Sequence, residues 1–489
     1  MMTRIPGETP VVRIAAAEPP GDSAAQERDG DRAIVEVGST GVPALEPLVL
    51  VTEGGETAYY TACSADRIDA IIDGTAGDPD AVVEHDPETA SLPAAPLSGL
   101  EAGRRRVLAG CGWRRPTSPA DHEAAGGFEP IDSEAVLDVG TTLRGRGWGD
   151  LCQDEFVADT WGTVRAADGD PAVVVNAHGT AADTLLLSSV PFEVLEGAVA
   201  AGQAVGATRI LVYASAADGR VVETARQAAE AYPECPIPID VVTGPDSYRA
   251  AAPTMALEAL EGNHRLEARL RPPGPETVGL HGQPTLLHTP RTLAQLSVAR
   301  RAGAAQRTRL TTVDGDVETP ATVETTEREP LSTALEAVTV EGTFKAARVG
   351  GRFGGLTDDL GVAADPTELA AADLGTEGAL YVLNEGRCLV EFVGQTAQFA
   401  AEENCGRCVP CREGTSQLAG LLRELYDGSY PAADIEELLR VMSTSSICAF
   451  GVEAARPIRT AMATFESTFE AHADGRCPAG QCLDSLEVA

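Results

Sequence analysis

Three cysteines at two-residue spacing form the densest group of reactive side chains in this 489-residue chain. Cys405, Cys408 and Cys411 lie within the stretch "ENCGRCVPCREGT". A cubane iron–sulfur cluster needs four soft ligands around a volume that one C-x2-C pair cannot enclose. Cys448, in "STSSICAFG", is the fourth candidate, because antiparallel packing of helices would return it to the first three. The spacing therefore predicts a [4Fe–4S] site on these four cysteines.

Two other interpretations of this motif stay open. Zinc sites usually take their cysteines as separated C-x2-C pairs around one tetrahedral ion. Three cysteines at two-residue spacing plus a distant fourth favour a cluster over that arrangement. The third interpretation is a set of structural thiols without any ligand.

A second group of cysteine and histidine residues follows towards the end of the chain. The segment "HADGRCPAGQC" contains His472, Cys477 and Cys482, and Cys388 after "YVLNEG" is a candidate fourth ligand. Mixed cysteine and histidine ligands at close spacing suit zinc. The alternative is a short tail with idle thiols. The other cysteines are isolated, and we expect them to be buried small apolar residues: Cys63, Cys111, Cys152 and Cys235.

The charge balance restricts the compartment and the partners. Acidic residues number 74 against 37 basic ones, which gives a formal net charge of −37 that is spread along the chain. Molar salt would screen the resulting self-repulsion, so we expect a halophilic protein from a salt-accumulating cytoplasm. Nucleic acid is disfavoured as a partner because phosphate binding needs clustered cations. No apolar run approaches the roughly 20 residues of a membrane span, so we expect no membrane insertion.

Several domains must position these groups, because the length predicts about three. Short buried β runs alternate with helical periods in the middle of the chain, and the last part is helical throughout. The patterns divide the chain into a flexible tail (1–32), a small α/β unit with its linker (33–95), an α/β domain with a βαβ unit (96–305), a β-rich domain (306–392) and a helical bundle with the cysteine motif (393–489).

The cysteine motif also resembles a known family. "ENCGRCVPCREGT" is similar to the "ESCGKCxPCREGT" segment of the flavoprotein (51-kDa-type, NADH-binding) subunit of respiratory NADH dehydrogenase, a family shared with NAD-linked hydrogenases and formate dehydrogenases. Further resemblance lies in 104–131, 259–294 and 309–324. It implies an α/β plus α+β multidomain protein: a degenerate thioredoxin-like unit, a Rossmann-like flavin domain, a ubiquitin-like β-grasp (SLBB-like) domain and a cluster-binding bundle. The acidic composition indicates a divergent, haloarchaeal member.

The thioredoxin-like unit of this resemblance is degenerate because its cysteines are missing. The resemblance implies cysteines near Ser39 and Val42, and the sequence has none there. We therefore expect no cluster in the N-terminal unit.

The resemblance also implies where FMN and NAD(H) would bind, and the sequence departs from the family there. The matching FMN positions that keep the family's residue are Arg146, Gly147, Asn176, Tyr248 and Thr292. Other contact positions are altered: Trp148 and Asp150 replace glycines, His178 and Gly179 replace an acidic pair, Ala252 and Pro253 replace two glutamates, and His288 and Thr289 replace two asparagines. A tryptophan side chain or a carboxylate where the backbone must approach a ligand is a steric and electrostatic obstacle. The altered residues therefore cluster at one pocket, whereas the scaffold survives.

Two functions follow from the resemblance. The first is an electron-transfer oxidoreductase subunit with one [4Fe–4S] cluster, linked to NAD(P)H or flavin in a remodelled pocket; if active, it would be an NADH dehydrogenase (quinone)-type enzyme. The second is an iron–sulfur scaffold or relay subunit that has lost FMN and NADH binding. In both cases the expected partners are redox subunits of a hetero-oligomer: a thioredoxin-like [2Fe–2S] subunit and a formate dehydrogenase- or hydrogenase-like subunit. A protein that only binds zinc at the central motif is the third alternative.

Overall fold

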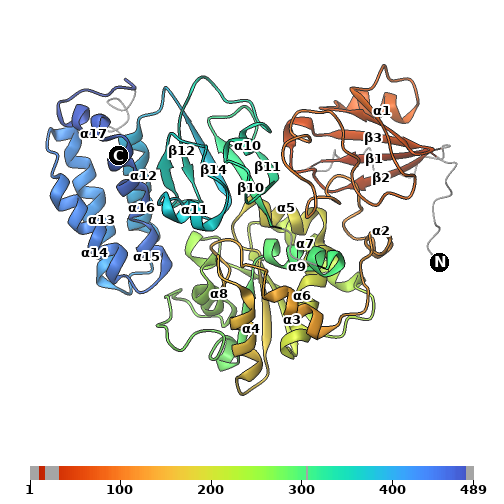
Figure 1. The fold of residues 1–489 in the computed structure, drawn as a ribbon, viewed down its shortest axis with the longest axis horizontal. Coiled ribbons are helices and arrows are strands. Elements are labelled where there is room, and N and C mark those ends of the chain that lie inside the picture. The colour runs from red at the N-terminus through yellow and green to blue at the C-terminus, as the bar shows by residue number, and fades with distance from the viewer. Residues whose placement is uncertain (1–9, 17–31, 304–306, 481–489) are drawn as a thin grey trace.

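The chain forms three β-sheets and a C-terminal group of helices in the residues that its structure, a computed structural model, describes: 10–16, 32–303 and 307–480. Figure 1 shows the N-terminal sheet at one end and the helical group at the other. A β-rich domain lies between them, and a larger α/β domain lies below. This mixed architecture agrees with the predicted α/β plus α+β class.

The N-terminal sheet has the strand order β2-β1-β3-β4-β5, in which β1 and β2 are parallel and the other pairs antiparallel. Its elements are β1 (Val11–Ala15), β2 (Ala33–Val37), β3 (Leu48–Glu53), β4 (Glu56–Tyr60), α1 (Ala65–Ile72) and β5 (Ala81–Glu84). The prediction of a flexible tail over 1–32 is wrong for Val11–Ala15. This strand pairs on both sides, and its alternate residues Val12 and Ile14 are buried.

The α/β domain is built around a four-stranded parallel sheet of order β8-β7-β6-β9. Its strands are β6 (Ala172–Asn176), β7 (Arg209–Ser215), β8 (Ile239–Gly244) and β9 (Thr285–His288). Its helices are α2 (Pro119–Ala124), α3 (Ser133–Gly140), α4 (Val157–Ala166), α5 (Ala181–Ser189), α6 (Pro191–Val205), α7 (Gly219–Ala231), α8 (Pro253–Leu260) and α9 (Pro290–Ala302). The predicted βαβ unit is confirmed, since α6 links two neighbouring parallel strands and ends at Gly206 in the left-handed conformation.

The β-rich domain holds a five-stranded sheet of order β11-β10-β14-β12-β13. Its elements are β10 (Thr308–Gly315), β11 (Ala321–Thr326), α10 (Ser332–Leu335), β12 (Phe344–Val349), β13 (Gly355–Thr357), α11 (Pro366–Ala371) and β14 (Ala379–Asn384). Strand β14 lies parallel to β10 and antiparallel to β12. Apolar residues of this sheet and of the N-terminal sheet share one buried cluster, so the two domains pack together.

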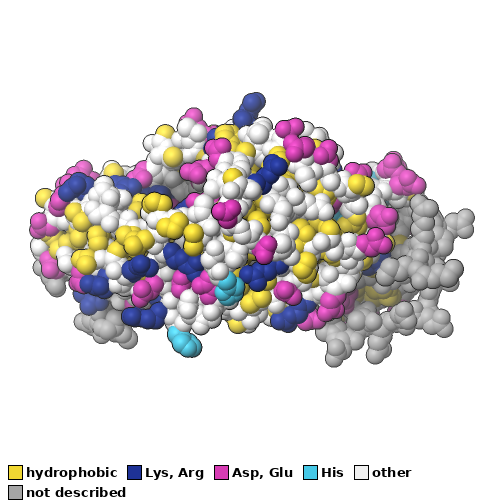
Figure 2. All heavy atoms as spheres, turned by 90° about the horizontal axis from the view of Figure 1, so that it is seen from below, with side chains coloured by type: hydrophobic (Ala, Val, Ile, Leu, Met, Phe, Trp, Pro, Cys, Tyr) yellow, Lys and Arg dark blue, Asp and Glu magenta, His cyan; other side chains and the backbone are white. Residues whose placement is uncertain are grey.

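The helical group comprises α12 (Leu389–Glu403), α13 (Val409–Glu424), α14 (Ala432–Ser445), α15 (Ala449–Glu453), α16 (Arg456–Thr464) and α17 (Glu466–Ala473). Short 3-10 turns complete the list: η1 (Pro43–Leu45), η2 (Tyr248–Ala251), η3 (Leu280–Gly282) and η4 (Leu425–Asp427). Within the described part, no single helix is long and apolar enough to cross a membrane; α5 and α6 pass that test together but are bent by 98°. Figure 2 shows acidic and basic side chains interspersed over one face, as the sequence suggested.

Candidate functional site

The four predicted cluster cysteines come together where two helices begin. Cys408 is the N-cap of α13, with Cys411 in the first turn, and Cys448 is the N-cap of α15. A Cβ atom added to Gly451 would lie 2.8 Å from the Cβ of Cys411, so the segment after Cys448 packs directly on the motif. The thiols of all four residues act on one another electrostatically. The free N–H groups at the starts of these helices favour negatively charged sulfur ligands.

The spacing of these sulfurs differs from that of a single-ion site. Four thiolates around one zinc ion at about 2.3 Å lie about 3.8 Å from one another. Among the described residues, no three of these four cysteines have sulfur atoms that all lie within 4.8 Å of one another. Cys408 and Cys411 are within side-chain hydrogen-bonding reach, and a cubane, which is larger than one ion, accommodates such a partly open set of thiols.

Burial and the neighbouring thiols oppose ionisation of Cys411 and Cys448. Burial raises the pKa of the Cys411 thiol far above its ordinary value, and the charges of Cys408, Cys448 and Cys405 raise it further. Burial also raises the pKa of Cys448, while the backbone N–H groups of Gly451 and Phe450 oppose that change. Four adjacent thiolates are therefore stable only when a positively charged group neutralises them.

The second predicted ligand group is also assembled in part. Cys388 Sγ lies 3.2 Å from His472 Nε2, and the ligand atoms of Cys388, His472 and Cys477 all lie within 4.8 Å of one another. His472 Nδ1 lies 2.7 Å from the carbonyl oxygen of Thr468. Although burial would lower it, the pKa of His472 is raised to about 9 by the hydrogen bonds with Cys388 and Thr468. Cys482 lies outside the described residues.

The five predicted FMN positions lie in or beside the loop 145–150, and the protein uses their polar groups only in part, because Arg146 Nε and Nη1 are buried without a hydrogen-bond partner among the described residues. Arg146 Nη2 forms an ion pair with Glu327 at 2.6 Å, which draws the side chain towards the β-rich domain. The backbone N–H of Arg146 donates to Thr292 Oγ1. Asn176 Nδ2 donates to the carbonyl oxygens of Gly149 and Ala251, while its Oδ1 is buried without a partner.

Asp150, one of the residues that replace a family glycine, ties this loop to the start of α9 by hydrogen bonds. Its carboxylate accepts hydrogen bonds from Cys152 N (2.8 Å), Thr292 Oγ1 (2.7 Å) and Thr289 N (3.1 Å). Trp161 Nε1 donates to His288 Nε2, so His288 carries its proton on Nδ1 and donates it to Asp150 at 3.1 Å. Asp150 therefore occupies donors at the N-terminus of α9 that could otherwise hold an anionic group of a nucleotide.

Trp148, the other replacement, fills the space beside Asp150. Its indole stacks on Tyr248 with 4.5 Å between ring centroids and 20° between planes, and it is 3% exposed. The Tyr248 ring contacts three further rings: Phe353, Phe399 and Phe450. This aromatic cluster belongs to the same buried core as Cys411. The sequence indicated the obstacle at position 148 but not the aromatic cluster, because the rings around Tyr248 come from segments far apart in the chain.

The other altered positions also make structural contacts. Pro253 begins α8, and Ala252 is its N-cap residue, so neither offers a polar side chain to a ligand. His178 stacks on Tyr213 and its Nε2 lies 2.8 Å from the carbonyl oxygen of Pro245. We call the pocket around the loop 145–150 the flavin seat. The indole of Trp148 and the carboxylate of Asp150 lie there, each in place of a glycine of the family.

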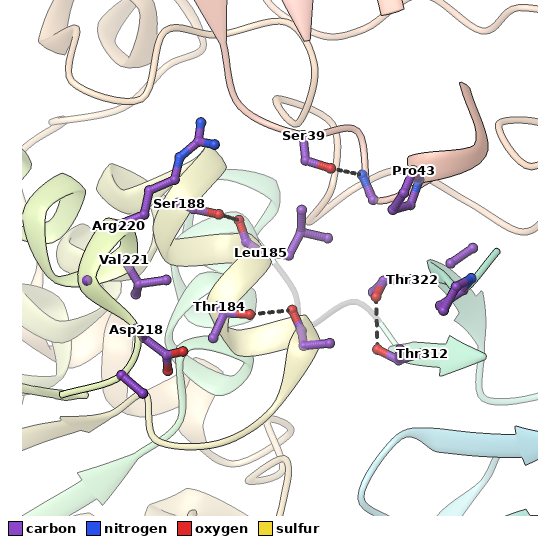
Figure 3. Close-up of a pocket in the computed structure, with 16 residues that line it drawn as sticks. Ser39, Pro43, Thr184, Leu185, Ser188, Asp218, Arg220, Val221, Thr312 and Thr322 are labelled. Atoms are coloured by element: carbon purple, nitrogen blue, oxygen red, sulfur yellow. Dashed lines mark hydrogen bonds between the residues drawn. The ribbon is translucent and has the colours of Figure 1, made fainter. Parts of the chain in front are cut away.

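A separate cavity of about 400 Å³ lies between the N-terminal loop, α5, α7 and the strands β10 and β11 (Figure 3). Its hydroxyl groups bond to close neighbours, as in the pair Thr312 and Thr322 at 2.8 Å. At its edge, Ser39 Oγ and the backbone N–H of Thr40 both donate to Glu46 Oε1 at 2.7 Å. A carboxylate thus organises the loop where the resemblance implies cysteines that this chain lacks.

Two family models match the chain. The NADH-ubiquinone oxidoreductase-F iron–sulfur binding region matches residues 391–472, and the Nuo51 FMN-binding domain matches residues 159–297. The F component of NADH-quinone oxidoreductase from Mycobacterium tuberculosis is 31% identical over 412 residues, which cover 74% of this chain and 89% of the relative. The chain belongs to the family of these NADH-quinone oxidoreductase F components. It therefore contains the iron–sulfur binding region and the FMN-binding domain of that family.

Hydrogenase subunits are similar as well. The NADP-reducing hydrogenase subunit HndC of Solidesulfovibrio fructosivorans is 26% identical over 430 residues, covering 77% of this chain and 85% of the relative. A crystal structure of NAD+-reducing [NiFe]-hydrogenase in the H2-reduced state aligns with a TM-score of 0.64 over 96% of this chain and 85% of that one, at 24% identity. This structural likeness supports the fold.

Proposed function

We propose that this chain is an electron-relay subunit that carries one [4Fe–4S] cluster on Cys405, Cys408, Cys411 and Cys448. The observation that carries the proposal is the convergence of these thiols at the starts of α13 and α15, inside the matched iron–sulfur binding region. A cubane on four thiolates accepts and releases single electrons. The surrounding core fixes the ligands: Cys411 is 4% exposed, and Thr415 Oγ1 donates to its carbonyl oxygen.

We further propose that the flavin seat of the FMN-binding domain is filled by the protein itself, which is the second of the two predicted functions. Trp148 takes the place of a planar ring system, and Asp150 takes the donors of an anionic group. Electrons for the cluster then come from another subunit. This proposal includes the redox partners predicted from the sequence and a cytoplasmic location. The partners are supported by the names of the similar proteins, which are hydrogenase and NADH-quinone oxidoreductase subunits.

The cluster assignment is tested on anaerobically purified protein. We expect about four iron and about four acid-labile sulfide per chain. Cys408→Ser should lose most of both, whereas Cys235→Ser, a change at an unrelated half-buried thiol, should keep them. Iron content that is unchanged in Cys408→Ser would refute the ligand set. Stoichiometric flavin in the denatured supernatant would refute the filled seat but not the cluster.

We also propose that Cys388, His472 and Cys477 bind zinc together with Cys482, the remaining ligand predicted from the sequence. The support is the short distances within the described trio and the contact of His472 Nδ1 with Thr468 O, which turns Nε2 towards Cys388 Sγ. The measurement is zinc and iron content of two variants. Cys388→Ser should lose zinc and keep iron, and Cys408→Ser should do the opposite. Zinc that is absent from the wild type under zinc-replete expression would contradict this site.

A further inference from the structure

A second cavity, of about 410 Å³, lies where the start of α5, one face of the β10–β14–β12 sheet and α12 meet. Three arginines line it: Arg291, Arg348 and Arg352. Most of its wall comes from residues 312–399, which lie outside the segment that matches the FMN-binding domain. Trp148 and Asp150 do not line it. The cavity adjoins the flavin seat, because Tyr248, Gly179 and Arg291, which lies against Gly147, border it.

Arg348 is a buried cation without a charged partner. Its side chain belongs to a residue that is 7% exposed, and its Nε is buried without any hydrogen-bond partner. Its guanidinium lies 5.0 Å from the ring centroid of Tyr381 and 5.1 Å from that of Phe392. Among the described residues, no carboxylate lies within ion-pair distance of it. Burial and the neighbouring Arg352 lower the pKa of Arg348 to about 10, so it is still charged near neutral pH.

The other two arginines differ in how they are compensated. Arg291 is fully paired, because its Nη2 lies 2.9 Å from Asp183 Oδ2 and its Nε lies 3.1 Å from Asp183 Oδ1. Arg352 lies over the ring of Phe399 at 4.2 Å and has no ion pair within the described parts of the chain. Arg348 and Arg352 thus form no ion pair among the described residues, and they share this cavity with the carboxyl groups of Asp314 and Glu377. A buried cation without an anion is costly, so the site favours an anionic ligand.

Glu377 completes the polar wall. It is 9% exposed, and its carboxyl group has no hydrogen-bond partner in the described residues. Burial raises the pKa of Glu377 to about 7, while Arg291 and Arg348 oppose that change. The charged groups that act on it are Arg291 of α9, Glu453 of α15, Asp183 of α5 and Arg348 of β12. When protonated, this carboxyl can donate a hydrogen bond to an anion beside Arg348.

We propose that this cavity binds a small organic oxyanion, a compound whose phosphate or carboxylate group pairs with Arg348 and Arg352. The volume leaves room for an organic body next to Tyr381 and Phe399. Guanidinium groups match both kinds of oxyanion through paired N–H donors. The site goes beyond the proposed electron relay, because neither the cluster cysteines nor the residues that fill the flavin seat take part in it.

The test is calorimetric titration of the intact, cluster-loaded chain at constant ionic strength. The probes are AMP, citrate and inorganic phosphate, with adenosine as the uncharged control. We expect at least one of the anions to saturate a single site and adenosine not to bind. Tightest binding of AMP would identify a phosphate ester, and tightest binding of citrate would identify a polycarboxylate. The proposal is overturned if no anion saturates, or if adenosine binds as tightly as AMP.

Variants locate the binding in this cavity. Arg352→Gln, at an exposed position, should weaken the anion at least about tenfold. The matched control is Arg440→Gln, whose side chain is 63% exposed on α14, and it should leave affinity unchanged. Because a protonated Glu377 helps the anion, the affinity should be higher at pH 6 than at pH 8, and Glu377→Gln should flatten this profile. Equal affinity in wild type and Arg352→Gln would place the anion elsewhere and contradict the proposal.

Discussion

At the residue scale, two substitutions change the chemistry of the loop 145–150 next to the FMN-binding domain. Asp150 and Trp148 stand where the family has glycines, and each makes contacts that a glycine cannot make. The carboxylate accepts from hydroxyl, imidazole and backbone donors, and the indole stacks on Tyr248, whose ring contacts Phe353 and Phe450 of two other domains. Both side chains therefore form contacts within the protein itself.

The role of Asp150 can be measured through stability. Asp150→Asn keeps the shape but places an amide N–H₂ or a neutral oxygen against donors that need a carboxylate, so we expect a loss of about 2–4 kcal/mol in the free energy of unfolding. Denaturant unfolding in molar salt measures it. Asp474→Asn is the matched control, since its side chain is 69% exposed in a surface ion pair and should change stability by less than about 1 kcal/mol. Equal effects of the two substitutions would contradict the internal role of Asp150.

The sequence alone predicted which candidate metal ligands lie close together, but it did not predict the pocket beside them. Cysteine spacing shows which thiols can share a cluster, because ligand type and spacing are local properties. The gathering of Cys388 with His472 was also suggested by residue type. By contrast, Arg348 gave no signal, since its lack of a charged partner depends on which side chains fold against β12. The same holds for Tyr248, whose ring contacts come from segments more than a hundred residues apart.

At the element scale, buried charges bind α6 to α9 and to the segment before α2. Glu193 accepts from Arg301 Nη2 at 2.5 Å and from Arg114 Nη1 at 2.7 Å, and all of these side chains are largely buried. Glu196, one turn later on α6, pairs with His122, Arg300 and Arg301. The sequence predicted α6 from its apolar pattern, but not this network, because its partners come from other elements.

This network makes stability depend on acid. Burial alone would raise the pKa of Glu193, but Arg301 and Arg114 lower it to about 2, below the ordinary value of 4.5. A depressed pKa contributes stability that is present above pH 4.5 and is lost as the pH falls towards 2. We expect a contribution of about 3 kcal/mol, and Glu193→Gln should remove most of this acid dependence. An acid titration followed by circular dichroism measures the acid dependence of wild type and variant. Identical profiles of the two proteins would contradict the stabilising role of Glu193.

The start of α15 packs closely on Cys411, one of the proposed cluster ligands. A Cβ at position 451 would lie 2.8 Å from Cys411 Cβ and 2.5 Å from Ser446 Oγ, so Gly451→Ala must push the Cys448 segment away from the motif. We expect lower iron content per chain and faster loss of iron in air. Gly420→Ala on α13 is the control, because no atom would lie within 4 Å of its new Cβ. Full iron content in Gly451→Ala would show that the packing at α15 does not position the ligands.

At the scale of the whole molecule, the two main features are the net charge and the order of the domains. The chain carries a formal net charge of −37, spread over surfaces that mix both signs. The domain order places the cluster-binding helices at one end and the N-terminal sheet at the other, with the sheets between them (Figure 1). Alternating strands and helices predicted most of this order, whereas β1 was missed because it is a single short strand in a polar segment.

The net charge predicts a salt requirement. Self-repulsion is screened as the Debye length falls from about 10 Å at 0.1 M to about 3 Å at 1 M salt, so the midpoint of thermal unfolding should rise with KCl over this range. Sucrose at matched osmolality is the control, since it stabilises proteins without screening charge. A midpoint that rises equally in sucrose and in KCl would exclude screening as the cause.

The central claim is that the cluster is present while the flavin seat is filled, and one spectroscopic measurement tests both parts. Electron paramagnetic resonance spectra of the anaerobically purified chain are recorded after addition of dithionite and, separately, of NADH. Dithionite should produce the signal of a reduced [4Fe–4S] cluster on Cys405, Cys408, Cys411 and Cys448, and NADH alone should leave the spectrum unchanged. Reduction of the cluster by NADH in the isolated chain, or no cluster signal with dithionite, would contradict the account.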